Sequence, residues 1–138
     1  MTEEKNFDKV PGKIIKHFSK GITHNLVLWI ISKKTIHGYG IMKELDNFFN
    51  FEGGKCEMSI NSSKIYPILS KMEKKGLITG EWKVNENNKQ AKYYSITEDG
   101  ELVLNNIKSH MTSILSNSSW IEFIEDMTGR EINNEKRN

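Results

Sequence analysis

The side chains best suited to chemistry in this 138-residue chain gather near residue 62, where a helix is predicted to start. Asn61, Ser62 and Ser63 are all competent N-caps, and the same groups can bind phosphates or read base edges. Lys64 adds a positive charge at the same place. Tyr66, one turn further on, can reach a phosphate or a sugar, or equally cover the core. The group is a candidate nucleic-acid contact, with helix capping as the alternative role of its Ser and Asn residues.

A polar turn near residue 90 supplies a second candidate contact. Lys89, Gln90 and Lys92 suit a minor-groove or backbone contact, and Lys71 is expected on the outward side of the preceding helix. Residues 59–97 carry seven lysines against three glutamates, a net charge of +4, whereas residues 98–138 carry four basic and eight acidic residues, a net charge of −4. Lysine-rich helices are often merely solvated. Here the positive excess coincides with both candidate contacts, which favours a nucleic-acid partner.

Signals for metal binding or catalysis are weak. The four histidines (positions 17, 24, 37 and 110) and Cys56 lack the spacing of metal ligands. The chain contains no glycine-rich phosphate loop, His-Glu-x-x-His motif or nucleophile elbow. We therefore expect no catalytic residue, no metal and no cofactor, and we do not expect an enzyme. No apolar stretch approaches the roughly 20 residues that a membrane span needs, so a cytoplasmic protein is expected.

Hydrophobic periodicity predicts the helices that hold these side chains. Residues 24–32 are expected to form a largely buried helix with Thr23 as its N-cap. A second helix runs from about residue 37 to 49, with Ile41, Leu45 and Phe48 on its apolar face. The third helix begins at residues 61–63, accepts Pro67 in its first turns, and ends at Gly76.

The period then changes from 3.6 to 2, which predicts a β-hairpin. Its strands cover residues 78–84 and 92–96, joined by the polar turn at residues 85–90. Ile78, Trp82 and Val84 share the face expected to be covered, and either Tyr93 or Tyr94 should be buried against Trp82. The predicted fold class is mainly α with a small β-hairpin: a winged helix-turn-helix followed by a C-terminal dimerisation helix.

The C-terminal region carries a second pattern. Leu104, Ile107, Met111 and Ile114 follow one another at spacings of 3, 4 and 3, which predicts a dimerisation seam, although packing within one chain would give the same pattern. The stretch 116–119 interrupts the helix, and Ser119 with Glu122 fits a capping box for a last helix at residues 120–127. The expected divisions are a flexible N-terminus (1–12), a winged helix-turn-helix DNA-binding domain (13–97), dimerisation helices (98–128) and a disordered tail (129–138).

Four short motifs, taken together, resemble the PadR family of transcriptional regulators. They are His37-Gly38-Tyr39, Ile65-Tyr66-Pro67-Ile68-Leu69, residues 72–78 and residues 92–97. The resemblance covers roughly residues 22–105 and implies a dimeric winged helix-turn-helix repressor of the compact branch, with residues 85–92 as its wing. It adds Tyr39 to the candidate DNA contacts. Family members usually carry Gly-Thr or Gly-Ser where this chain has Ser63-Lys64.

Compact members of this family can hold a flat aromatic compound by means of a tryptophan in the dimerisation helix. Met111 stands at that position here, and Trp120 follows nine residues later. Trp29 and Trp120 are therefore candidate contacts for a small aromatic effector, with ordinary core or interface packing as the alternative.

The predicted function is a homodimeric repressor that binds double-stranded DNA at a palindromic operator and is released by a small molecule or a stress signal. The alternative is a winged-helix module that binds a protein partner and has no sequence-specific DNA binding.

Overall fold

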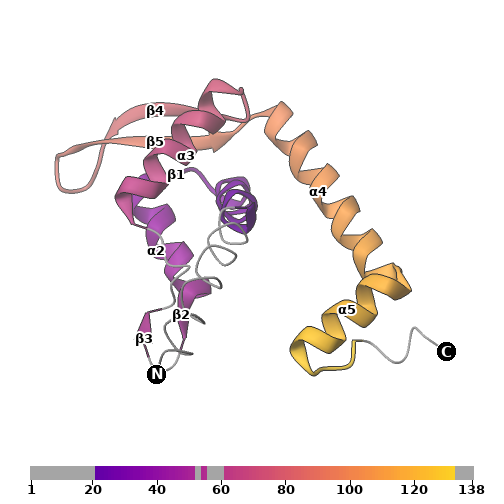
Figure 1. Ribbon diagram of the computed structural model, residues 1–138. Helices are drawn as coiled ribbons and strands as arrows, with labels where there is room; N and C mark the ends of the chain where they lie inside the picture. Colours follow the sequence, from indigo (N-terminus) through magenta and orange to yellow (C-terminus); the bar gives the residue numbers. More distant parts are fainter. Residues whose placement is uncertain (1–20, 52–53, 56–60, 133–138) are drawn as a thin grey trace. The chain divides into compact units, whose positions relative to one another are not determined.

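The computed structural model describes residues 21–51, 54–55 and 61–132, and the chain divides into two compact units after Leu104. The first unit holds a helix described over residues 21–33, α2 (Gly38–Phe49) and α3 (Ser62–Lys74). Two short paired strands, β2 (Asn50–Phe51) and β3 (Gly54–Lys55), follow α2. The helices lie on the residues that periodicity predicts, and they are shown in indigo to magenta in Figure 1.

The winged part of the first unit is a three-stranded antiparallel sheet in the order β1-β5-β4. Strands β4 (Ile78–Val84) and β5 (Gln90–Ile96) form the predicted hairpin, which runs alongside α3 (Figure 1). Strand β1 (Ile36–His37) was not predicted, because two residues are too few to show a period of two. It pairs Ile36 with Tyr94, so the chain entering α2 is hydrogen-bonded to the wing.

A single apolar core joins the three helices to the sheet. Its centre is formed by aliphatic side chains that are almost fully buried, and the fully buried large residues are Val27, Leu28, Ile31, Ile41, Leu45, Ile65, Leu69 and Ile78. Burial of each such side chain contributes about 1.5–3 kcal/mol to the free energy of folding. Tyr94 is the aromatic residue that the sheet adds to this core.

Three packing expectations are wrong. Thr23 does not cap a helix, because the helix is already present at residue 21 and Thr23 lies buried within it. Phe49, not Phe48, is buried at the end of α2. Trp82 is 65% exposed and Val84 is also exposed, so Tyr94 is not buried against Trp82. Alternation shows which residues share a face of a strand, but it does not show how far along the strand the helices cover that face.

The end of α3 is a Schellman motif built around a left-handed glycine. The amide of Gly76 (φ 78°) donates to the Glu73 carbonyl at 3.0 Å, and the amide of Leu77 donates to the Met72 carbonyl at 3.0 Å. The prediction of a stop at Gly76 is therefore confirmed. Since β4 begins at Ile78, this turn is also the covalent joint between α3 and the wing.

The start of α4 (Glu98–Ser116) is fastened to that same turn. Thr97 Oγ1 donates to the Gly76 carbonyl at 2.6 Å and accepts from the Gly100 amide at 3.0 Å. A Cβ at Gly100 would overlap the Leu77 carbonyl oxygen, so only glycine allows this approach of the helix.

The second unit begins at Asn105, within α4, and contains α5 (Ser118–Thr128). The predicted interruption is confirmed, but the N-cap is Asn117 and not Ser119. The Asn117 side chain accepts from the Trp120 amide at 3.0 Å, and Gly129 (φ 68°) ends the helix. Within the expected tail of residues 129–138, the Ile132 amide donates to the Glu125 carboxylate at 2.8 Å.

Several expectations lie outside the described residues. These are the flexible N-terminus at 1–12, the segment at 13–20 that opens the expected DNA-binding domain, Cys56, and the last part of the tail at 133–138.

Candidate nucleic-acid interface

The N-terminal turn of α3 presents an exposed polar group. Asn61 is the N-cap in extended conformation, but its side chain makes no capping hydrogen bond and instead accepts from Ser63 Oγ. Its main-chain carbonyl accepts from the Lys64 and Ile65 amides, each at 3.0 Å. Ser62, Ser63 and Lys64 are exposed. Because the Asn61 side chain accepts no hydrogen bond from a main-chain amide of α3, helix capping does not account for these side chains.

Tyr66 is 48% exposed, and it connects the start of α3 with the start of α2. A Cβ placed on Gly38 would lie 2.7 Å from Cε1 and 2.9 Å from the hydroxyl oxygen of Tyr66, so the ring lies directly on Gly38. Both expected roles of Tyr66 therefore fit, since one part of the ring packs and the rest stays accessible. Sequence reasoning missed the role of Gly38, although a glycine at a helix start is a usable signal of close approach.

The start of α2 adds an aromatic and basic cluster. Tyr39 is exposed, and Lys43 Nζ lies 5.3 Å from the centre of its ring. His37 Nδ1 accepts from the Gly40 amide at 2.9 Å, so the imidazole caps α2, while its ring centre lies 5.1 Å from that of Tyr93. The sequence contains no conventional N-cap residue at position 37, which is why this role was not predicted.

The wing ends in a turn organised by Asn85. Its side-chain oxygen accepts from the Asn87 amide at 3.0 Å and from the Lys89 amide at 2.9 Å. Asn88 takes up the left-handed conformation (φ 60°) that such a turn requires. The turn therefore presents the exposed side chains of Lys89 and Gln90 in an ordered frame.

Lys92 differs from the other candidate contacts because its charge is already paired. Its Nζ lies 2.8 Å from Glu73 Oε1 on α3 and 5.6 Å from the centre of the Tyr94 ring. The hydrogen bond to Glu73 raises the pKa of Lys92 above its usual value of 10.5, against the opposing effect of burial. Lys64, Lys71 and Lys89 remain exposed, so the structure separates Lys92 from them.

The expected seam residues lie in different surroundings. Leu104 is only 6% exposed and is buried at the end of the first unit, so packing within the chain accounts for it. In the second unit, Met111 is 60% exposed, and Ile107 and Ile114 are half-buried. Other large apolar side chains are exposed in this unit as well, namely Leu115, Trp120, Phe123 and Met127.

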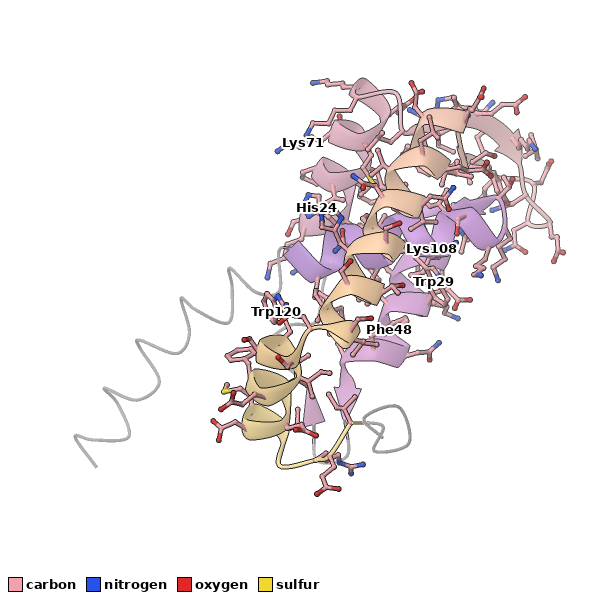
Figure 2. The ribbon with its side chains drawn as sticks, turned by 90° about the vertical axis from the view of Figure 1, so that its right-hand side faces the viewer. His24, Trp29, Phe48, Lys71, Lys108 and Trp120 are labelled. Carbon is pink, nitrogen blue, oxygen red and sulfur yellow. The ribbon has the colours of Figure 1, made fainter. Side chains whose placement is uncertain are left out.

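The two candidate effector contacts, labelled in Figure 2, are both partly exposed tryptophans that pack edge-on against a phenylalanine. Trp29 contacts Phe48 in the first unit, with ring centres 6.2 Å apart, and Lys33 Nζ lies 5.3 Å from the Trp29 ring. Trp120 contacts Phe123 on α5, with ring centres 5.9 Å apart. The described residues form no cluster of three or more histidine, cysteine or acidic side chains that could hold a metal ion. No described helix is both long and apolar enough to cross a membrane.

Helix α2 is joined by a connection to α3, which has an exposed polar start, and the β4–β5 hairpin lies beside α3. This arrangement defines a winged helix-turn-helix protein. The chain belongs to the PadR-like family of transcriptional regulators, whose family model matches residues 27–106. Members of this family are transcriptional regulators.

Solved structures agree with this assignment. A PadR-like transcriptional regulator from Bacillus cereus is 26% identical, with a TM-score of 0.61 over 81% of this chain and 96% of that one. A Streptococcus transcriptional regulator is 25% identical, with a TM-score of 0.60 over 77% and 94% of the two chains. A PadR family regulator from Eggerthella lenta shares the fold at 24% identity, with a TM-score of 0.64 over 81% and 91%. Among curated proteins, none matches the chain significantly.

Proposed function

We propose that the chain is a homodimeric repressor that binds a palindromic operator and is released from it by a small molecule or a stress signal. The observation that carries the DNA-binding part is the exposed polar and basic start of α3, which lies in the same unit as an ordered wing tip. In this arrangement α3 enters a major groove, while Lys89 and Gln90 contact the adjacent backbone or minor groove.

The dimer is supported by the apolar surface of the second unit. Met111, Leu115, Phe123 and Met127 are each more than half exposed. Several large apolar side chains exposed on two consecutive helices are a feature of protein–protein interfaces. A twofold dimer would place its two α3 helices on half-sites about 34–36 Å apart, as a palindromic operator requires.

Release by an effector requires a ligand that prefers a non-binding arrangement of the dimer, because only differential affinity shifts such an equilibrium. Trp29 and Trp120 supply partly exposed aromatic surfaces for a flat ligand. Fluorescence titration of planar dyes tests this part of the proposal. Loss of dye binding in Trp120→Phe would support a role for that side chain, and an unchanged titration would remove it.

The primary experiment is a fluorescence-anisotropy titration on DNA from the protein's own promoter, with a scrambled duplex as control, at two salt concentrations. We expect promoter-selective binding that weakens steeply with salt. Lys64→Ala should weaken binding, equally on both duplexes if Lys64 contacts phosphate and mainly on the promoter if it reads a base. Lys108→Ala removes the same charge from an exposed site in the second unit and is the matched control.

Weak binding that is equal on both duplexes and abolished by salt would contradict the repressor proposal. That result would favour the alternative of a winged-helix module for a protein partner.

A further inference from the structure

The Lys92–Glu73 ion pair has a setting unlike that of a surface pair. Its side chains are 28% and 33% exposed, with 2.8 Å between the charged atoms. The pair Lys34–Glu44 is longer at 3.3 Å, and its side chains are 61% and 39% exposed. Partial burial reduces solvent screening, so the Lys92–Glu73 pair should hold its geometry better than the Lys34–Glu44 pair does.

The aliphatic part of Lys92 is also held in place. A Cβ on Gly80 would overlap Cε of Lys92 and lie 3.2 Å from its Cγ and Cδ, so the stem crosses the space that glycine leaves open. Gly80 pairs with Tyr94 across the hairpin, and the Lys92 ammonium group lies 5.6 Å from the centre of the Tyr94 ring. Glycine, an aromatic ring and a carboxylate thus restrict one side chain on three sides.

The pair joins the wing to α3 at a second place, away from the covalent connection between them. The wing is joined to α3 covalently only at the Gly76–Leu77 turn, and Glu73 lies one turn of helix before that joint. The two residues of the ion pair are 19 positions apart in the sequence, and the pair connects α3 directly to β5, the second strand of the hairpin. The hairpin is also held by the pairing of β5 with β1 and by Tyr94 in the core. The ion pair adds a direct side-chain connection between α3 and β5, which restricts the freedom that remains in the angle between them.

We propose that Lys92 is a positioning residue that fixes the angle between the wing and the DNA-reading helix, and that it does not contact a phosphate. This inference rests on the proposed DNA-binding function. Simultaneous contact of α3 with one groove and of Lys89 with the neighbouring backbone requires a constant spacing between helix and wing tip. The Lys92–Glu73 pair maintains that spacing before DNA is bound, so less conformational entropy is lost on binding.

Two variants test the proposal on the promoter duplex. Lys92→Met keeps an unbranched stem over Gly80 and removes the charge, and Glu73→Gln removes the partner. Each should weaken binding about 3- to 10-fold, and the double variant should be no weaker than either single one, since both changes break one interaction. The slope of log affinity against log salt should stay at its wild-type value in all three.

Lys89→Met is the matched control, because it removes a lysine from the same hairpin. It should reduce the salt slope by about 0.9, the value for one phosphate contact. A phosphate contact by Lys92 predicts the opposite pattern. Lys92→Met would then lower the slope by the same amount, and Glu73→Gln would free the lysine and tighten binding. Either of these results would overturn the proposal.

A measurement without DNA separates this inference from the proposed function. Hydrogen exchange of the free protein should be faster in β4 and β5 for both Lys92→Met and Glu73→Gln, and unchanged in residues 21–33 and in the Lys89→Met control. Unchanged exchange in the wing would refute the positioning role even if promoter binding were confirmed. Faster exchange together with a failure to select the promoter would support the role and reject only the repressor function.

If a single variant does not fold, the charge reversal Glu73→Lys with Lys92→Glu replaces it. The reversed pair should recover wing protection to within about threefold of wild type, because its attraction is restored. Exchange as fast as in the single-charge variants would contradict the ion-pair mechanism.

Discussion

At the scale of single residues, Gly38 shows how a missing side chain makes room for a neighbouring aromatic ring. The Tyr66 ring occupies the space that a Cβ on Gly38 would need, and this contact holds the ring at the junction of α2 and α3. Tyr66 remains 48% exposed in the first turns of α3, the part of the helix for which DNA contact is proposed.

Gly38→Ala should therefore destabilise the protein by about 1–3 kcal/mol, since the new methyl group overlaps the Tyr66 ring. Urea unfolding followed by circular dichroism measures the change. Gly21→Ala is the matched control, because nothing lies within 4 Å of a Cβ there. In a helix this control should be neutral or stabilising by up to about 1 kcal/mol. Equal stability of Gly38→Ala and Gly21→Ala would show that the Tyr66 contact is not tight.

The residues of the wing pair also predict a pH dependence. The Glu73 hydrogen bond raises the pKa of Lys92 above 10.5, and burial raises the pKa of Tyr94 above 10.0. Both groups thus hold their proton more tightly in the folded chain, so the unfolded chain loses protons first. Their contribution to stability is complete below about pH 10 and is lost as the pH rises through the folded pKa values.

Unfolding free energies measured from pH 8 to pH 12 should therefore fall more steeply for the wild type than for Lys92→Met or Tyr94→Phe. Lys89→Met, which changes an exposed lysine, should follow the wild-type curve. Parallel curves for all four proteins would contradict the raised pKa values of Lys92 and Tyr94.

At the scale of elements, Thr97 joins three parts of the structure. Its hydroxyl group bonds to the Gly76 carbonyl and the Gly100 amide, and its own amide donates to the Leu77 carbonyl at 3.1 Å. One residue therefore ends the wing, caps α4 and holds that cap against the end of α3.

Thr97→Val removes the hydroxyl group with little change of shape, and it should cost about 1–2 kcal/mol of stability because a cap and a second hydrogen bond are lost. Thr97→Ser should keep most of this stability. Thermal unfolding compares them with Thr112→Val, whose hydroxyl bonds only to the Lys108 carbonyl of its own exposed helix turn. A Thr97→Val loss no larger than that of Thr112→Val would argue against the junction.

Elements were predicted well where a strong local period or a glycine stop marks them. The bounds of α2 and α3, the hairpin and the interruption near residue 117 follow from such local signals. The contacts of Lys92 and Gly80 could not be predicted, because they depend on a helix residue 19 positions away and on a cross-strand neighbour. A sequence shows that Lys89 and Lys92 are both lysines, but only the fold separates an exposed charge from a paired one.

At the scale of the whole molecule, the apolar side chains of the second unit carry the proposed dimer. Leu104 does not belong with them, because it is buried in the first unit. The seam to be tested is therefore Ile107, Met111 and Ile114.

Met111→Glu combined with Ile114→Glu should convert the dimer to monomers in sedimentation equilibrium, since burying two carboxylates without partners is unfavourable. Leu102→Glu is the control, because Leu102 is exposed on α4 within the first unit. An intact dimer in the double variant would exclude the seam, and dissociation by Leu102→Glu would place the interface elsewhere on α4.

Pro67 lies inside α3 as the sixth residue of the helix, and its nitrogen carries no proton. The Ser63 carbonyl oxygen therefore lacks a helical donor, and the first turn is tied to the rest of α3 by one main-chain hydrogen bond fewer. Leu69 and Met72, beyond the proline, stay fixed in the core. Ile65, two residues before the proline, is also fully buried, so the apolar core replaces the missing hydrogen bond in holding the first turn in place.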